Sequence, residues 1–137
     1  MALTHLADTS VLTRLSAAPV RAVLEPLVGS RSLARAGITD LEVAFCARDS
    51  SEWDALLTAL SVFQLIESTA THVTRARQVQ RLLAEGRLRG RKVPDLLIAA
   101  AAEERGLIVV HYDADFEMIS SVTGQPVEWV VARGSIV

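Results

Sequence analysis

The feature that most constrains the fold is a run of mostly apolar residues, LIVVHY at 107–112, which follows Gly106 and ends at Asp113. A strand is apolar along its whole length, rather than at every second residue, when both faces of its sheet are covered. Such strands are usually parallel, and parallel strands are joined by crossover connections that are mostly helices. The run therefore predicts an α/β fold in which helices flank a buried, mostly parallel sheet.

The rest of the chain alternates between strand and helix patterns. Apolar runs predict strands at 2–7, 32–36, 62–67, 107–112 and 127–132. Apolar spacing, capping residues and glycines at helix ends predict seven helices. The first begins at Thr9 or Ser10, and the others cover 17–29, 39–49, 52–60, 71–86, 94–106 and 114–122. Thr39 and either Ser50 or Ser51 are the predicted N-caps of the third and fourth helices. The length of 137 residues, half of them apolar, suits one domain over 1–137.

Composition excludes several classes of protein. The net charge is -2, so the chain is not a strongly basic nucleic-acid binder overall, although a local basic patch is compatible with this charge. The single cysteine, Cys46, excludes an internal disulfide and a thiolate zinc site. His5 and Asp8 interrupt the N-terminal apolar stretch, which excludes a secretory signal, and the apolar run 96–102 is too short to cross a membrane. We expect a soluble cytoplasmic protein without a membrane partner.

Four acids lie at the edges of the predicted elements. Asp8 and Asp113 each follow an apolar strand, and sites in open parallel sheets form at the carboxyl ends of strands. Asp95 lies in the first turn of the helix 94–106, and Glu42 lies near the start of the helix 39–49. The topology of an α/β sheet can bring such positions to one edge, although the spacing in sequence does not establish that they meet.

Each acid also has a purely structural explanation. The two strand-end aspartates could start turns or cap helices. Asp95 could stabilise its own helix through the helix dipole, an effect of about 0.3–1 kcal/mol. Glu42 could complete a capping box with Thr39. For Asp40, a capping or solvated role is favoured over a role in a site.

Convergence of the four acids would require compensation of their charge. At about 4 Å and an effective dielectric constant of 20, one pair of carboxylates costs on the order of 4 kcal/mol. Such a cluster persists only if protons or a cation neutralise it. Oxygen ligands without histidine or thiolate select Mg²⁺ or Mn²⁺, and these ions promote phosphodiester cleavage by activating a water and stabilising the leaving oxygen.

Four segments, taken in order, resemble the acidic motifs of PIN-domain nucleases, and their spacing is similar to that of the VapC-type toxins of toxin–antitoxin pairs. These segments are LADTSVL at 6–12, ITDLEVAF at 38–45, VPDLLIAAAAEERG at 93–106 and IVVHYDADFEMI at 108–119. The resemblance extends essentially from end to end, including the closing VEWVV strand. It implies a PIN-like fold of three layers, with helices on both sides of a central sheet.

The resemblance also implies an activity and a set of site residues. It assigns catalysis to Asp8, Glu42, Asp95 and Asp113, binding of Mg²⁺ or Mn²⁺ to the same four acids and Asp115, and an auxiliary role in orienting a ligand or water to Ser10. It implies cleavage of RNA by a metal-activated water, a cognate antitoxin and a homodimer. Many relatives carry Thr or Ser at the position of His111, for which a packed or solvated strand-end role is favoured over contact with phosphate.

A basic loop precedes the third motif. It contains Arg87, Arg89, Arg91 and Lys92, to which Arg75, Arg77 and Arg81 of the preceding helix could add. Beside an acidic site this loop could bind RNA phosphates, and the alternative is a solvated loop. Trp53 and Trp129 are candidates for packing in the core or between subunits, and stacking on RNA is the less favoured alternative. The alternative to a nuclease is a non-catalytic module that keeps the PIN scaffold and binds RNA or protein, although the intact acids argue against it.

Overall fold

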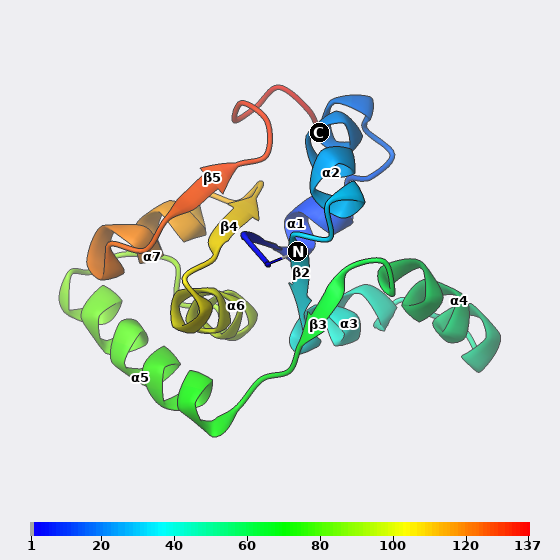
Figure 1. Ribbon diagram of the computed structural model, residues 1–137. Helices are drawn as coiled ribbons and strands as arrows, with labels where there is room; N and C mark the ends of the chain where they lie inside the picture. Colours follow the sequence, from blue (N-terminus) through cyan, green and yellow to red (C-terminus); the bar gives the residue numbers. More distant parts are fainter. Residues whose placement is uncertain (1) are drawn as a thin grey trace.

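A computed structural model describes residues 2–137 of the protein. Its centre is a sheet of five parallel strands in the order β3-β2-β1-β4-β5 (Figure 1). The strands are β1 (His5–Ala7), β2 (Leu33–Ala36), β3 (Gln64–Ile66), β4 (Ile108–His111) and β5 (Val127–Trp129). The predicted α/β fold with a parallel sheet is confirmed, and each strand is shorter than the apolar run that predicts it.

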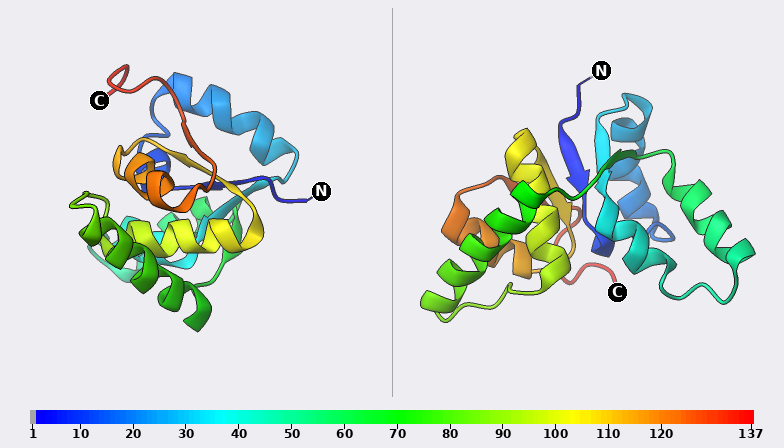
Figure 2. Two further views of the ribbon diagram at one scale, coloured as in Figure 1. Left: turned by 90° about the vertical axis from the view of Figure 1, so that its left-hand side faces the viewer. Right: turned by 90° about the horizontal axis from the view of Figure 1, so that it is seen from below.

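Helices cover both faces of this sheet. They are α1 (Thr9–Leu12), α2 (Ala18–Gly29), α3 (Gly37–Ala44), α4 (Ser50–Leu60), α5 (Ala70–Glu85), α6 (Val93–Arg105) and α7 (Asp115–Thr123). The helices α5, α6 and α7 lie on one face, and α1 and α2 lie on the other (Figure 2). Within residues 2–137, no helix combines the length and the apolar character that crossing a bilayer requires.

The two cores explain why the central strands are apolar along their length. Adjacent side chains of a strand point to opposite faces of the sheet. Leu6 and Val109 belong to the core under α5, α6 and α7, whereas Ala7 and Val110 belong to the core under α1 and α2. All four side chains are buried, so neither face of β1 or β4 is left for polar residues.

The helix predicted at 39–49 differs from the structure at both ends. β2 passes directly into α3, which begins at Gly37 with Ala36 as its N-cap and without a side-chain capping bond. Thr39 is fully buried within the helix, so its prediction as an N-cap is wrong. A cap at Thr39 would need a loop after β2, and the chain forms none there.

The cap of α4 also differs from the prediction. The carboxylate of Asp49 accepts a hydrogen bond of 2.8 Å from the backbone amide of Glu52 and caps the helix. The prediction of Ser50 or Ser51 as the cap is therefore wrong, because an aspartate one residue earlier occupies that position.

Asp40 is not a cap or a solvated acid, as the sequence suggests, but half of a largely buried ion pair. Arg35 Nε donates to Asp40 Oδ1 at 2.7 Å, and Arg35 Nη2 donates to Oδ2 at 3.1 Å. The remaining nitrogen, Nη1, donates to the backbone oxygens of Leu60, at 3.0 Å, and Phe63. Because these residues lie on β2, α3 and the end of α4, the guanidinium fixes the three elements relative to one another.

Candidate active site

Asp8 is the most deeply buried of the predicted site acids, with 2% of its surface exposed. Its amide donates to the backbone oxygen of Val110 on β4, and its Oδ2 accepts from the amide of Ser10 at 3.0 Å, which caps α1. Its Oδ1 is buried without a hydrogen-bond partner. Burial raises the pKa of Asp8, and the bonds from Ser10 only partly oppose this rise. A cation or a proton would satisfy this unpaired buried oxygen.

Asp113 follows β4, the strand that pairs with β1, and so lies at the same edge of the sheet as Asp8. Its Oδ1 accepts from the amide of Asp115 at 2.9 Å, and its Oδ2 accepts from Lys92 Nζ at the same distance. Partial burial acts to raise the pKa of Asp113, but these two donors outweigh it and the pKa is lowered. Asp113 therefore carries its negative charge more readily than an ordinary aspartate.

Asp95 reaches this edge from the first turn of α6, which runs antiparallel to β4. It is 6% exposed, and within residues 2–137 its Oδ2 accepts no hydrogen bond, although Lys92 Nζ lies 3.5 Å away. Burial, followed by the negative charges of Asp8 and Asp113, raises the pKa of Asp95 to about 7, although Lys92 acts in the opposite direction. One carboxylate oxygen from each of Asp95, Asp113 and Asp115 lies within 4.8 Å of the other two. Two of the acids that the sequence places at separate element edges, Asp95 and Asp113, thus meet, and the charge of Asp8 acts on Asp95.

Lys92 lies among these acids. Its Nζ is 2.9 Å from Asp113, 3.2 Å from Asp115 and 3.5 Å from Asp95. Desolvation acts to lower the pKa of Lys92, but the three carboxylates outweigh it and raise the pKa. The loop 87–92 reaches this place by passing close to α7, where Gly90 has φ of +87° and a Cβ atom would lie 2.9 Å from the backbone oxygen of Asp115. A glycine is needed there on both counts.

Glu42 comes to the site from α3 and is held by Thr9. The Thr9 hydroxyl donates to Glu42 Oε1 at 2.6 Å and lies 3.0 Å from the hydroxyl of Thr39. The capping-box alternative for Glu42 is wrong, because α3 begins before Thr39. The negative charge of Glu42 contributes to the raised pKa of Asp8, which places the two carboxylates within electrostatic reach.

The two residues that follow Asp8, Thr9 and Ser10, bind different parts of the structure. The hydroxyl of Ser10 accepts from the amide of Tyr112 at 2.9 Å, which ties α1 to the end of β4. Thr9 contacts the acid Glu42, a contact that sequence patterns do not predict because the two residues are 33 positions apart.

His111 is fully buried, in agreement with its expected packed role. It stacks on Phe116 at a centroid distance of 5.4 Å and lies 4.8 Å from the centroid of Trp129. Its Nδ1 accepts from the amide of Asp113 at 3.2 Å, and its Nε2 lies 3.3 Å from Glu117 Oε1. Burial lowers the pKa of His111, so the ring is neutral and positions the loop that carries Asp113.

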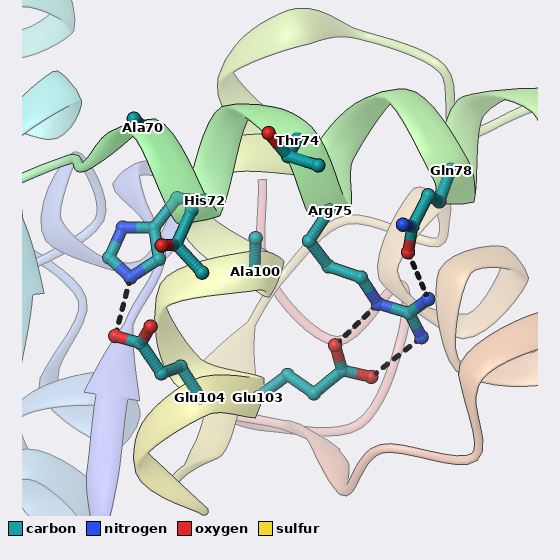
Figure 3. Close-up of a pocket in the computed structure, with 9 residues that line it drawn as sticks. Ala70, His72, Thr74, Arg75, Gln78, Ala100, Glu103 and Glu104 are labelled. Atoms are coloured by element: carbon teal, nitrogen blue, oxygen red, sulfur yellow. Dashed lines mark hydrogen bonds and ion pairs between the residues drawn. The ribbon is translucent and has the colours of Figure 1, made fainter.

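A separate hollow lies between α5 and α6 (Figure 3). Its charged side chains already bind one another: Arg75 Nε lies 2.7 Å from Glu103, and His72 Nε2 lies 2.9 Å from Glu104. Both glutamates are at the C-terminal end of α6, whereas Asp95 is at its N-terminal end. The hollow therefore belongs to the contact between the two helices and is not part of the acid cluster.

The other predicted basic residues lie on the surface. Arg87, Arg89 and Arg91 are exposed, and Arg91 lines a hollow with Arg77 and Arg81 of α5. Gln80 Nε2 donates to the backbone oxygen of Arg91 at 3.4 Å, which holds the loop against α5. We call Arg87, Arg89, Arg91 and Lys92 the basic strip. Because Arg91 precedes Lys92 directly, the strip begins next to the acids.

Comparison with known proteins places the whole site inside a family match. The PIN domain family matches residues 6–121, a range that contains every acid described above. Ribonuclease VapC51 of Mycobacterium tuberculosis is 59% identical over 99% of both chains, and Ribonuclease VapC21 of the same species is 44% identical over 96% of both. Among solved structures, VapBC-5 of M. tuberculosis has a TM-score of 0.63 at 25% identity over 93% of this chain and 95% of that chain. The DNA-bound VapBC of Salmonella typhimurium has a TM-score of 0.74 at 22% identity over 94% and 99%, which is a likeness of fold.

Proposed function

The chain belongs to the PIN domain family and is a relative of the VapC ribonucleases, and from this membership we propose that it is a metal-dependent endoribonuclease, the toxin of a toxin–antitoxin pair. The observation that carries the proposal is a pair of buried carboxylate oxygens that accept no hydrogen bond within residues 2–137, Asp8 Oδ1 and Asp95 Oδ2, although Lys92 Nζ lies 3.5 Å from the second. Buried acceptors that point into an acidic cluster are unfavourable unless a cation or proton satisfies them.

The residues present fit Mg²⁺ or Mn²⁺. All the donors are carboxylate oxygens, which these hard cations prefer, and no thiolate competes within the cluster. We assign the holding of the metal to Asp8, Asp95 and Asp113, with Asp115 beside them and Glu42 completing the shell directly or through water. When bound, such an ion lowers the pKa of a water and stabilises negative charge on phosphate oxygens.

Lys92 has two roles in this proposal. In the metal-free protein its ammonium neutralises part of the charge of Asp95, Asp113 and Asp115. Because the ammonium is carried on a flexible four-carbon stem and is more than half exposed, it can leave these acids and contact a substrate phosphate. His111 and Thr9 act through other residues, since they position Asp113 and Glu42 respectively.

The basic strip of Arg87, Arg89, Arg91 and Lys92 is proposed to hold the RNA backbone. An acid cluster repels a polyanion, so affinity must come from neighbouring cations. The hollow that Arg91 shares with Arg77 and Arg81 extends the strip along α5. These contacts position the strand and carry no base specificity by themselves.

Protein partners are part of the same proposal. Several solved structures of similar fold are of VapBC complexes. The apolar side chains of Leu41 on α3, Phe45 directly after α3 and Trp53 on α4 are exposed, Phe45 by 91%, which supports contact with another protein. We propose a cognate antitoxin as a partner and a homodimer as the toxin's own assembly.

The test of the proposal is cleavage of single-stranded and structured RNA by the purified protein. We expect cleavage with Mg²⁺ or Mn²⁺ and none in excess chelator, with activity restored when the metal is returned. Undiminished cleavage in chelator would overturn the metal dependence. No cleavage of any RNA, together with no metal binding by calorimetry, would favour the non-catalytic module.

Metal binding should also be visible without a substrate. At a free Mg²⁺ or Mn²⁺ concentration of 100 times the Kd, binding adds about 2.7 kcal/mol to the free energy of unfolding. For a chain of 137 residues this corresponds to a rise in Tm of roughly 10 °C. Differential scanning fluorimetry would measure it, with potassium chloride at equal ionic strength as the control. The same shift in potassium chloride would mean that screening, rather than a metal site, stabilises the cluster.

A further inference from the structure

A depression of about 590 Å³ lies beside the acid cluster, on the side of the C-terminal segment. Its lining includes Asp113, two aromatic residues and two arginines, namely Tyr112, Trp129, Arg14 and Arg133. We call it the aromatic–arginine depression. Because Asp113 belongs both to it and to the acid cluster, any occupant of the depression abuts the acids.

The two aromatic rings are held at the edge of the sheet. In the pairing of β4 with β5, Trp129 lies opposite His111, two residues before Asp113. The rings of Tyr112 and Trp129 meet edge to face, with centroids 5.7 Å apart and planes at 87°. The Tyr112 hydroxyl accepts from the amide of Gly134 at 2.9 Å and donates to the backbone oxygen of Ile136 at 2.7 Å. These bonds fix the ring, so the depression is built before anything enters it.

Each ring carries a guanidinium group over its face. Arg14 lies 4.9 Å from the centroid of Tyr112, and Arg133 lies 5.6 Å from the centroid of Trp129. Arg14 also donates to two backbone oxygens, to Ser10 from Nη1 at 2.7 Å and to Val137 from Nε at 3.0 Å, which hold it over α1. Within residues 2–137, neither arginine lies within 4.0 Å of an aspartate or glutamate oxygen. Their charges are therefore available to an anion.

We propose that the aromatic–arginine depression is a nucleotide subsite for an unpaired residue of the RNA substrate, an inference that rests on the proposed nuclease function. The base next to the cleaved phosphate stacks on the guanidinium of Arg133 and the ring of Trp129 behind it. The charge of Arg14 faces the sugar-phosphate backbone. Single-stranded RNA is recognised by stacking of splayed bases on aromatic and guanidinium planes, and bases of a duplex are not available for it.

The position of the depression favours RNA over a protein segment. The basic strip of loop 87–92 and the aromatic–arginine depression adjoin the same acids through different residues, Lys92 and Asp113. A single strand whose phosphate lies at the acids can contact both at once, with cations on each side of the cleaved bond. The subsite would therefore supply the base contact that the basic strip lacks.

Fluorescence of Trp129 tests the stacking directly. The chain has two tryptophans, so Trp53→Phe leaves Trp129 as the sole reporter. In chelator, which prevents cleavage, a short oligoadenylate should quench its emission, and an abasic oligomer of equal length and charge should not. Equal quenching by the two oligomers, or binding of the oligoadenylate without any quenching, would overturn the stacking.

Variants of Arg133 give a second test that does not disturb the core, because this side chain is exposed. Arg133→Ala should weaken oligoadenylate binding by about 10-fold, the loss expected for one stacked base. It should also reduce the slope of log affinity against log salt by about 0.7, the value for one phosphate charge on a single strand. Arg133→Lys should keep the salt slope and lose most of the stacking. The matched control is Arg105→Ala, which removes an exposed arginine at the opposite edge of the sheet.

The outcomes separate this inference from the function on which it rests. If Arg133→Ala behaves as Arg105→Ala in binding and in KM for RNA cleavage while cleavage itself is normal, the subsite is rejected and the nuclease stands. If oligoadenylate quenches Trp129 but no RNA is cleaved with either metal, the subsite stands and the nuclease proposal fails.

Discussion

Asp95→Asn is expected to lower the rate of RNA cleavage on the order of 1,000-fold while it raises the stability of the metal-free protein. The loss of rate follows from the proposed function, because the amide would remove a negatively charged metal ligand from the cluster. The gain in stability follows because Asp95 is buried beside Asp8 and Asp113, whose charges repel its own. A helix-capping acid would show the opposite change in stability.

The size of this gain in stability depends on pH. The pKa of Asp95 is about 7 in the folded protein, against 3.8 for the ordinary side chain, so the folded state favours the protonated form. This contribution to stability is complete below pH 3.8 and is lost as the pH rises to about 7. Above pH 7, Asp95→Asn should therefore gain about 1–2 kcal/mol, less than the full effect of the shift because Lys92 loses a partner.

Urea unfolding in chelator at pH 5 and pH 8 would measure this effect, together with the rate of cleavage in Mg²⁺. The gain should be larger at pH 8. The matched control is Asp54→Asn on α4, an exposed acid remote from the cluster, which should change neither quantity. A clear loss of stability in Asp95→Asn at pH 8 would show that its contact with the helix dipole outweighs the repulsion.

Arg35→Met is expected to destabilise the protein by about 3–5 kcal/mol, which lowers Tm by more than 10 °C. Removal of the guanidinium leaves Asp40 unpaired at a largely buried position and leaves the backbone oxygens of Leu60 and Phe63 without their donor. The double variant Arg35→Met, Asp40→Leu should recover part of the loss, because no uncompensated charge remains. Thermal and urea unfolding would measure both, and a loss below about 1 kcal/mol for the single variant would contradict the proposed anchoring.

Sequence patterns predicted the positions of the acids where the topology of the fold decides them. Asp8 and Asp113 follow neighbouring parallel strands, and Asp95 starts the helix that runs back along one of them, so all three had to reach one edge of the sheet. For Glu42 the sequence left a capping box as the alternative, and the start of α3 at Gly37 excludes it. Its hydrogen bond from Thr9 is compatible with the proposed role in the site.

Contacts between side chains of different elements could not be predicted from the topology of the sheet. Lys92 was assigned to a phosphate-binding loop, and its three bonds to the acids depend on the path of that loop past α7. The one sequence signal was Gly90, since a glycine inside a basic loop indicates a special backbone conformation or close packing. Arg35 and Asp40 are five residues apart, but the burial of their pair is set by the end of α4 at Leu60, which local patterns do not reveal.

The order of strands has a consequence for the time at which activity can arise. β4, although it is the fourth strand in sequence, lies between β1 and β5 and pairs directly with β1. The elements that carry Asp8 and Glu42 precede β4 in the chain and are therefore synthesised before it. Until β4 is added to β1, Asp113 is not beside them. A protein that is harmful to the cell that makes it would thus gain its complete acid cluster only after β4 has been synthesised and paired.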